Sequence, residues 1–391
     1  MPGFRRVMAI LGLLALLVAL IPPAAVLAND DDNDGQQRPP QVIPQGFEST
    51  GQLQRDAERA GRAPMYSAWI VESSRFMGVP FGAFMPDRAF VPGSANPNHN
   101  INTVDLPVNV GIIKGPDGKI TLYDSGWKQL HYIFDLNNSC CWKDLRDQLT
   151  AIGLSPADVT RIVIGHGHWD HAGQLSSFPN ATLFVQKEEL KAIDFFLNYP
   201  AEFNGGHIPA VNTSPVGCAR TPACGYPPQT VQEILGKVLA HKAQIVDGRK
   251  QIAPGLVIHP AFRGHTYGSQ LLQVHTARGE LMFGSDTYSS WEGIRDWNVA
   301  NVQQTDTVQQ FLAYEKCYVV AGAHSFNNCV SAHEPLSYSN GYPLTSNWWN
   351  IPSGNCSRAA ELVLAPGQTS LVPATPDRTP PASCVSTIPP H

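Results

Sequence analysis

The feature that most limits what this chain can fold into is a dense group of histidines and an aspartate. His166, His168, Asp170 and His171 lie within six residues, directly after the apolar run 161–164. Imidazole and carboxylate groups are ligands that suit zinc and related divalent cations. Because side chains two residues apart in an extended segment point the same way, His166 and His168 can share one cation. The sequence therefore predicts a metal-binding loop at the end of a buried strand.

The second half of this cluster comes where the chain must turn, because Ala172-Gly173 leads out of it. A loop of this kind can direct one pair of ligands to one cation and the next pair to a neighbouring cation. The alternative is a histidine-rich surface loop without a metal. The spacing of the ligands and the strand before them favour the metal site.

The surrounding sequence has the pattern of one α/β domain. The apolar runs 108–114 and 119–123 are predicted as two strands, joined by the turn Gly115-Pro116-Asp117-Gly118. Apolar periodicity predicts helices over 142–152, from 187, over 230–242 and over 308–314. Further strands are predicted over 161–164, 182–185, 256–261, 270–274, 281–284 and 318–321.

The N-terminus is typical of an export signal. Arg5 and Arg6 precede the apolar run 7–21, and small residues follow at 24–28. We therefore expect residues 1–28 to be a cleaved signal peptide and the mature protein to be secreted or periplasmic, without stable membrane insertion. An uncleaved anchor is the alternative, but the run is short for a membrane-crossing helix, which needs roughly 20 apolar residues.

Composition divides the rest of the chain. Residues 29–60 are acidic and then rich in Pro and Gln, which predicts a disordered linker, and 361–391 read as a Pro-rich tail. Between them, 61–360 form the folded domain, with a lid at about 198–229 where Pro, Gly and Asn recur. Since 43% of the residues are hydrophobic and 15% charged, this domain can bury a sizeable core.

Cysteine usage agrees with export, because the chain has eight cysteines, an even number. Cys218 and Cys224 lie close together in the lid, as in a small disulfide loop, and Cys317 and Cys329 could form a second bridge. Eight cysteines allow about 105 pairings, so the connectivity stays open. The remaining cysteines are Cys140, Cys141, Cys356 and Cys384, of which the adjacent two are expected to have different partners.

The charge of the chain bears on its partners. The formal net charge is −5, and no long basic stretch occurs. Binding of nucleic acid needs clustered Lys and Arg to neutralise phosphates, so we expect no nucleic-acid partner. A small-molecule substrate fits the cluster better. The sequence does not indicate an oligomeric state.

The segment HGHWDHAG (166–173) resembles the His-x-His-x-Asp-His signature of the metallo-β-lactamase superfamily, and the similarity extends over 108–325. The resemblance implies an α/β fold, the αβ/βα sandwich of two mixed β-sheets flanked by helices, here with a long Cys-containing lid. Upstream, Asp124 is similar to the aspartate of the family's strand-end Asp-x-Gly motif. The resemblance implies that Asp124 supports the metal loop through hydrogen bonds and does not bind metal; a plain turn aspartate is the alternative.

The resemblance also implies the remaining metal ligands. His265 is similar to the histidine of the family's Gly-His-Thr-x-Gly segment, and Asp286, at the end of a predicted strand, to its bridging aspartate. His324 ends another predicted strand and matches the last histidine, whereas His333 is a weaker candidate because no predicted strand precedes it. The implied first site is His166, His168 and His265; the second is Asp170, His171 and His324; Asp286 bridges them.

Such a site implies the chemistry of a hydrolase. Two divalent cations, expected to be zinc although iron, cobalt and manganese suit the same ligands, can share a hydroxide. Asp170 or Asp286 could then pass a proton to the leaving alkoxide. Tyr288 lies near, but one residue before, the position of a family tyrosine that holds the substrate carbonyl. No Gly-x-Ser-x-Gly nucleophile motif is present.

Among the branches of this family, the order of ligands is most similar to the acyl-homoserine lactonase type. The resemblance implies a zinc-dependent lactonase or esterase that opens lactones or related esters, including N-acyl-homoserine lactones, with a metal-bound hydroxide, and the N-terminus implies that it is exported. A β-lactamase or thioesterase of the same fold is the alternative enzyme. A metal-binding or substrate-binding module without catalysis is the alternative outside enzymes.

Overall fold

The computed structural model describes the folded part of the chain in several stretches. The described residues are 51–53, 55, 63–80, 103–128, 139–140, 142–198, 225–299, 306–321, 325–339, 342–345, 347–352 and 357–379. They belong to one unit, 43–391, and residues 1–42 lie outside the described part of the chain. The predicted signal peptide and most of the predicted lid, with Cys218 and Cys224, also lie outside them.

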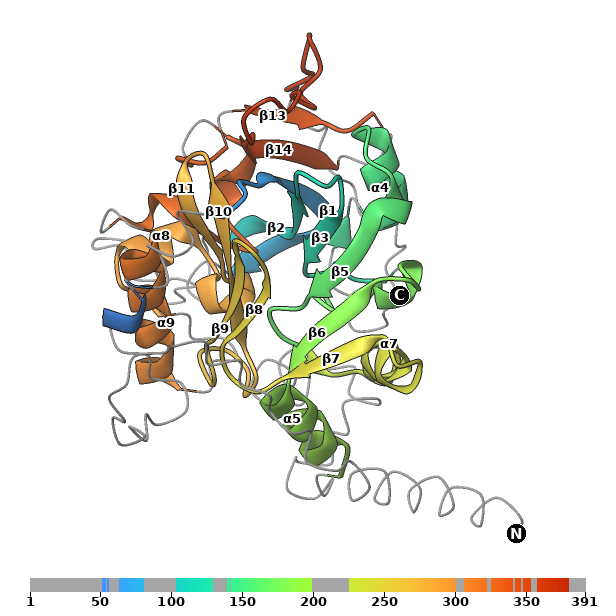
Figure 1. Ribbon diagram of the computed structural model, residues 1–391, viewed down its shortest axis with the longest axis vertical. Coiled ribbons are helices and arrows are strands. Elements are labelled where there is room, and N and C mark those ends of the chain that lie inside the picture. Colours follow the sequence, from blue (N-terminus) through green and yellow to red (C-terminus); the bar gives the residue numbers. More distant parts are fainter. Residues whose placement is uncertain are drawn as a thin grey trace, which may run out of the picture. The chain divides into compact units, whose positions relative to one another are not determined.

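Two mixed β-sheets form the centre of this unit (Figure 1). The strands from β13 to β3 in the first sheet are antiparallel, and β3, β5, β6 and β7 are parallel. In order across the sheet, its strands are β13 (Asn347–Asn350), β14 (Arg358–Val363), β1 (Ser67–Pro80), β2 (Thr103–Lys114), β3 (Ile120–Tyr123), β5 (Val159–Val163), β6 (Thr182–Gln186) and β7 (Ala243–Val246), and β4 (Ser139–Cys140) pairs with β1.

The second sheet combines a parallel pair with antiparallel neighbours. Strand β12 pairs in parallel with β11, and β11, β10, β9 and β8 follow in antiparallel order. Their bounds are β12 (Cys329–Val330), β11 (Gly279–Phe283), β10 (Gln270–Thr276), β9 (Leu256–Pro260) and β8 (Lys250–Ala253).

The sheets pack face to face because their strands are apolar on both sides. In β2, Ile113 faces the second sheet and contributes to the core with Leu272 of β10, whereas Val110 and Ile112 contribute to a separate core on the other face. Gly111 lies at a close contact between the sheets, since a Cβ there would come within 2.7 Å of the Phe283 ring. A strand that is buried on both faces is typical of a layered α/β fold.

Helices cover the two outer faces (Figure 1). Helices α8 (Trp291–Arg295) and α9 (Thr307–Val320) supply residues to the core around the second sheet. Helices α4 (Leu145–Ala151), α5 (Lys187–Asn198) and α7 (Pro228–Leu239) supply residues to the core on the outer face of the first sheet. The αβ/βα sandwich predicted from the resemblance is therefore confirmed.

Local sequence explains where several elements begin and end. The predicted hairpin is formed by β2 and β3, and Gly118 adopts a φ of 80° in the turn, where glycine is favoured. Helix α4 begins at Leu145 because Asp144 accepts a hydrogen bond from the Arg146 amide, which satisfies a free N–H of the first turn. Gly153, with a φ of 86°, follows its end.

One predicted strand is wrong. The apolar run 318–321 forms the last turn of α9 and the residue that caps it, and the Ala321 amide donates to the Cys317 carbonyl. Ala313, Cys317 and Val320 are spaced four and three residues apart and are buried together, which is helical periodicity. A four-residue apolar run cannot distinguish a strand from a buried helical turn, so the sequence alone was ambiguous there.

The described part of the domain extends beyond the predicted boundaries. Residues 51–53 are helical, and Leu53 is buried in the core, although 29–60 was predicted as linker. Strand β14 crosses the predicted start of the tail at 361 and pairs with both β1 and β13. The tail beyond it also contacts the domain, since the Asn350 amide donates to the Asp377 carbonyl.

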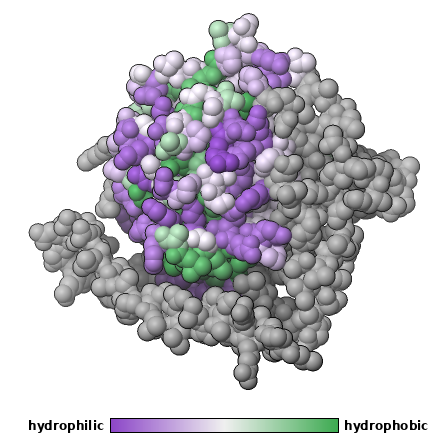
Figure 2. Space-filling model, turned by 90° about the vertical axis from the view of Figure 1, so that its right-hand side faces the viewer, coloured by the Kyte–Doolittle hydropathy of each residue, from purple (hydrophilic) through white to green (hydrophobic). Residues whose placement is uncertain are grey.

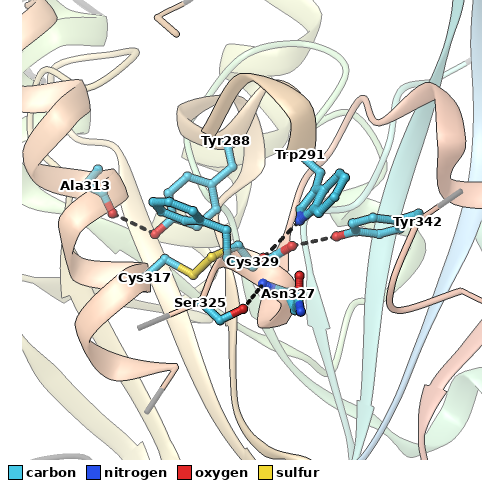
Figure 3. Close-up of a disulfide and its surroundings, with 9 residues drawn as sticks. Tyr288, Trp291, Ala313, Cys317, Ser325, Asn327, Cys329 and Tyr342 are labelled. Atoms are coloured by element: carbon cyan, nitrogen blue, oxygen red, sulfur yellow. Dashed lines mark hydrogen bonds between the residues drawn. A yellow bond between two sulfur atoms is a disulfide. The ribbon is translucent and has the colours of Figure 1, made fainter. Parts of the chain in front are cut away.

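A disulfide joins the end of α9 to β12 (Figure 3). Its cysteines, Cys317 and Cys329, are both fully buried, and the sequence left their pairing as one of several possibilities. Tyr342 donates a hydrogen bond to the Cys329 carbonyl beside it. The bridge therefore fixes β12, and the segment after it, against α9. The side chains of the other six cysteines lie outside the described residues.

The outer surface in Figure 2 is mostly hydrophilic among its described residues, with a hydrophobic area near its lower edge. None of the helices in the described stretches combines the length and apolarity that crossing a membrane requires.

Candidate metal centre

Five strand ends and loops meet at one place in the fold. Strands β3 and β5 are parallel, so their carboxyl ends bring Asp124 and the His166–His171 loop to the same edge. In the second sheet β11 and β12 are also parallel, and their carboxyl ends lead to Asp286 and His333. The loop between β9 and β10 carries His265. Ligands that are far apart in sequence are thus placed together by the topology.

The first ligand group consists of His166, His168, His265 and Asp286, all buried, with one ligand atom of each within 4.8 Å of the others. Nε2 of His265 lies 3.1 Å from Nδ1 of His168, and Oδ2 of Asp286 lies 3.3 Å from Nε2 of His265. These are the four residues that the resemblance implied for the first site and the bridge.

The second ligand group consists of Asp170, His171, Asp286 and His333, again all buried and within the same spacing. Oδ2 of Asp170 lies 3.2 Å from Nε2 of His171 and 3.5 Å from Nε2 of His333. Three of these four residues were expected from the sequence.

Asp286 belongs to both groups, each of its oxygens facing a different one. Oδ1 lies 3.0 Å from Nε2 of His171 and 2.8 Å from Nε2 of His333, in the second group. Oδ2 faces His265 and lies 3.9 Å from Nε2 of His166, in the first group. A carboxylate between two sets of imidazoles can bridge two cations, as predicted for this residue.

His333 occupies the position that the sequence assigned to His324. His324 itself lies outside the described residues. The strand expected before His324 is the end of α9, whereas a short strand, β12, ends three residues before His333. Nδ1 of His333 donates to the Pro107 carbonyl over 2.7 Å, which leaves Nε2 facing Asp170 and Asp286. A two-residue strand gives no periodicity, so the sequence could not reveal this position.

Hydrogen bonds behind the ligands fix their orientation. Oδ1 of Asp124 accepts from the Gly165 amide over 2.6 Å, and Oδ2 accepts from Nδ1 of His171 over 2.9 Å. Asp124 therefore supports the metal loop as the resemblance implied. The Ser285 hydroxyl lies 3.1 Å from Nδ1 of both His166 and His171. Contacts of this type direct the other ring nitrogen of each histidine toward a metal.

Two of these supporting residues have strained backbones. Asp124 has a φ of 66° and Ser285 a φ of 50°, in the left-handed region that side chains other than glycine rarely adopt. Such conformations cost about 1–3 kcal/mol each and persist where the surroundings require them. Gly165 makes the approach possible, because a Cβ there would come within 2.2 Å of Ser285 Cβ.

The electrostatics differ between the two groups. In the first, burial and the neighbouring imidazole of His265 lower the pKa of His168 to about 3, and burial also lowers the pKa values of His166 and His265. These rings are thus neutral, the form that binds a cation. In the second, burial opposes the change, but the carboxylates of Asp286 and Asp170 raise the pKa of His333 to about 10. The two carboxylates of the second group thus lie beside its imidazoles and interact with them strongly.

The buried polar atoms fit two metal ions. Nε2 of His166 is buried and has no hydrogen-bond partner, and Nε2 of His171 and Oδ1 of Asp286 are buried 3.0 Å from each other. Leaving such atoms unpaired costs free energy, and a cation between them would satisfy them together. Histidine nitrogens and carboxylate oxygens are the donor set of dinuclear hydrolases that use zinc and similar metals.

Tyr288, expected to contact substrate, is placed differently. Its side chain is fully buried in the core, and its hydroxyl donates to the Ala313 carbonyl of α9 over 2.8 Å (Figure 3). The ring packs against Gly284, where a Cβ would come within 1.9 Å of it. With its hydroxyl bonded to the backbone of a helix, Tyr288 supports the turn that carries Asp286 and does not face the metal ligands.

Aromatic side chains lie beside the second group. The ring of Phe76 lies 5.7 Å from that of His333, 5.5 Å from that of Trp169 and 5.7 Å from that of Trp127. Trp127 and Trp169 are 4.7 Å apart and nearly buried. This cluster, which sequence reasoning did not find, gives the centre an apolar neighbour.

Comparisons with known proteins agree with this geometry. A sequence profile described as the Metallo-beta-lactamase superfamily matches residues 103–317. The N-acyl homoserine lactonase AttM of Agrobacterium fabrum is 51% identical over 43 residues, 11% of this chain and 16% of that protein. An N-acyl homoserine lactonase of Bacillus cereus is 26% identical over 136 residues, 32% of this chain and 53% of that protein.

The chain thus spans no more than about half the length of these two curated relatives. Among solved structures, AidC, described as a dizinc quorum-quenching lactonase, is 19% identical with a TM-score of 0.47, over 70% of this chain and 89% of that one. Because the family profile covers more than half of the sequence and the ligand groups assemble as its signature requires, the chain belongs to the metallo-beta-lactamase superfamily.

Proposed function

We propose that this chain is an exported, zinc-dependent hydrolase that opens lactones or related esters, including N-acyl-homoserine lactones. The observation that carries the proposal is Asp286, whose two oxygens face separate buried histidine groups. A site with two cations that share a carboxylate suits hydrolysis of an acyl bond. The relatives named N-acyl homoserine lactonases support the choice of substrate.

The chemistry divides between the metals and the protein. When bound, two divalent cations lower the pKa of water and polarise a carbonyl group. The protein holds the ligands in place through Asp124 and Ser285, and His166, His168 and His265 stay neutral. Asp170 and Asp286 lie among the ligands, where either carboxylate can carry a proton to the alkoxide released when a lactone ring opens.

The surroundings of the centre fit an organic ester. Phe76, which packs against Trp127 and Trp169, places an apolar ring beside His333, so an acyl portion of the substrate can lie against Phe76. The chain is mildly acidic, with a net charge of −5 and no long basic stretch in its sequence, which does not favour a polyanionic substrate. We also propose export, on the strength of the basic and then apolar N-terminus and the buried disulfide.

A substrate panel tests the proposal. The zinc-loaded chain is assayed with an aliphatic γ-lactone, an acyl-homoserine lactone, an aryl ester, a thioester and a β-lactam. His166→Ala is the control, because it removes a ligand of the first group. We expect lactone turnover that falls at least 100-fold in His166→Ala. Turnover of the β-lactam or the thioester alone would overturn the choice of substrate. If no compound is turned over, the proposal that the chain is a hydrolase is contradicted.

A further inference from the structure

Glu189 is a buried carboxylate that belongs to neither ligand group but contacts the loops of the first group. Glu189, in the first turns of α5, has no exposed surface. Oε1 accepts from the Gly167 amide over 2.6 Å and from the Tyr226 hydroxyl over 2.6 Å. Oε2 accepts from the Thr266 hydroxyl and from the Gly268 amide, each over 2.8 Å. Both oxygens are thus used fully, by donors that carry no charge.

Three of these four donors, Gly167, Thr266 and Gly268, come from the two loops that carry the histidines of the first group. Gly167 lies between His166 and His168, and Thr266 follows His265 directly. One carboxylate therefore holds the backbone beside all three imidazole ligands of that group. Glu189 thus links the two loops, in addition to the contact between His265 and His168 and the hydrogen bond from the Gln270 amide to the Gly165 carbonyl.

The backbone of both loops lies in close contact with Glu189 at Gly268 and Gly167. A Cβ at Gly268 would come within 2.2 Å of the Glu189 backbone nitrogen, and a Cβ at Gly167 would lie 3.0 Å from Oε1. Glycine at both positions is what allows the amides to reach the carboxylate. The histidines of the two loops are therefore explained by the metal, and the glycines at 167 and 268 by the contact with Glu189.

A third segment joins the same carboxylate. Tyr226, which donates to Oε1, places its ring 5.0 Å from the imidazole of His168. Gly225, before it, lies against that imidazole, since a Cβ there would come within 1.9 Å of the ring. Glu189 therefore also anchors the segment that packs on His168 from outside the two ligand loops.

The second ligand group has separate supports. Asp124 orients His171, and the Pro107 carbonyl orients His333. None of the hydrogen bonds of Glu189 reaches these residues. We propose that Glu189 is the positioning residue of the first ligand group, setting the distance between its two histidine loops so that one of the two cations is held tightly. The inference rests on the metal centre proposed above and not on its substrate.

The test measures two metal affinities separately. Zinc is titrated into the metal-free full chain in competition with a chromophoric chelator, and the two affinities are assigned by comparison with His265→Ala and His333→Ala. In Glu189→Gln, we expect the first-group cation to bind 10–100-fold more weakly and the second-group cation to bind as in the wild type, since residues that orient metal ligands have effects of this size. In the cobalt-loaded protein, only the first-group absorption should change.

Glu361→Gln is the matched control. Glu361 on β14 also accepts only uncharged donors, from Trp69, Ser370 and Leu371, and is nearly buried, but it contacts no metal ligand. The Glu361→Gln variant should have a lower thermal stability than the wild type and the same affinity for each of the two cations. Thr266→Val removes one donor to Oε2 and keeps the side-chain shape, so it should weaken binding of the first-group cation by less than Glu189→Gln does. If Glu189→Gln fails to fold, Thr266→Val remains the test.

The outcomes separate the two proposals. Unchanged affinities in both Glu189→Gln and Thr266→Val, or equal weakening of both cations, would overturn the positioning role. If the wild-type chain binds two cations but opens no lactone, the positioning role of Glu189 stands and the proposed substrate is wrong. A wild-type chain that binds no cation would overturn both.

Discussion

Oδ2 of Asp124 lies 2.9 Å from Nδ1 of His171, and this contact decides which nitrogen of the imidazole faces the second ligand group. Because a carboxylate only accepts hydrogen bonds, Nδ1 must carry the proton, and Nε2 is left free for a cation. The backbone φ of 66° at Asp124 is the strain that this orientation costs.

Asp124→Asn should reverse that arrangement. The amide can donate to Nδ1, which would move the ring proton to Nε2 and block the ligand. We expect the second-group cation to bind 10–100-fold more weakly, with the overall fold kept. Zinc competition titration and circular dichroism together check this. An affinity equal to that of the wild type would show that Asp124 does not control His171.

His333→Ala should remove one cation and leave the other. Its Nε2 lies 2.8 Å from Oδ1 of Asp286 and 3.5 Å from Oδ2 of Asp170, so it completes the second group. Elemental analysis after dialysis should give one zinc per chain. His324→Ala is the informative comparison: if that variant loses the cation and His333→Ala keeps two, the ligand predicted from the sequence is the correct one.

Tyr288→Phe should affect stability rather than catalysis. The substitution removes a hydrogen bond to the Ala313 carbonyl from a fully buried position. The expected cost is about 0.5–1.5 kcal/mol of unfolding free energy, with kcat and KM on a lactone within about twofold of the wild type. A large fall in kcat without loss of stability would instead support the catalytic role expected from the sequence.

Acid should destabilise the protein partly through Glu72. Burial alone would raise the pKa of this fully buried carboxyl, but Arg358 and Arg75 hold it below its ordinary value of 4.5. A carboxyl whose folded-state pKa is lowered contributes stability above pH 4.5 and loses it as the pH falls further. Urea unfolding should therefore show a steeper loss below pH 4.5 in the wild type than in Glu72→Gln. Equal slopes would contradict the assignment.

The sequence revealed the elements whose pattern is local. The β2–β3 hairpin, β5 and the cluster after it, and β9 to β11 follow from apolar runs and turn residues within a few positions. His166, His168, Asp170 and His171 were found because they are adjacent, and His265 and Asp286 because the resemblance to the family named their surroundings.

What the sequence could not reveal depends on long-range packing. The run 318–321 continues α9 because the neighbouring turns of that helix are buried beside the second sheet. His333 is brought to the centre by a two-residue strand that pairs with β11, a contact without a local signal. Glu189 sits on an amphipathic helix, and only the folded loops show what its carboxylate binds.

The most direct test of the account is to count the cations that the centre holds. Zinc is titrated into the metal-free wild type and into Asp286→Ala, and the bound metal is measured by native mass spectrometry. Because Asp286 faces both ligand groups, we expect two cations in the wild type and weaker binding of both in the variant. A wild type that binds one cation or none, or a variant that loses only one of two, would contradict a centre bridged by this residue.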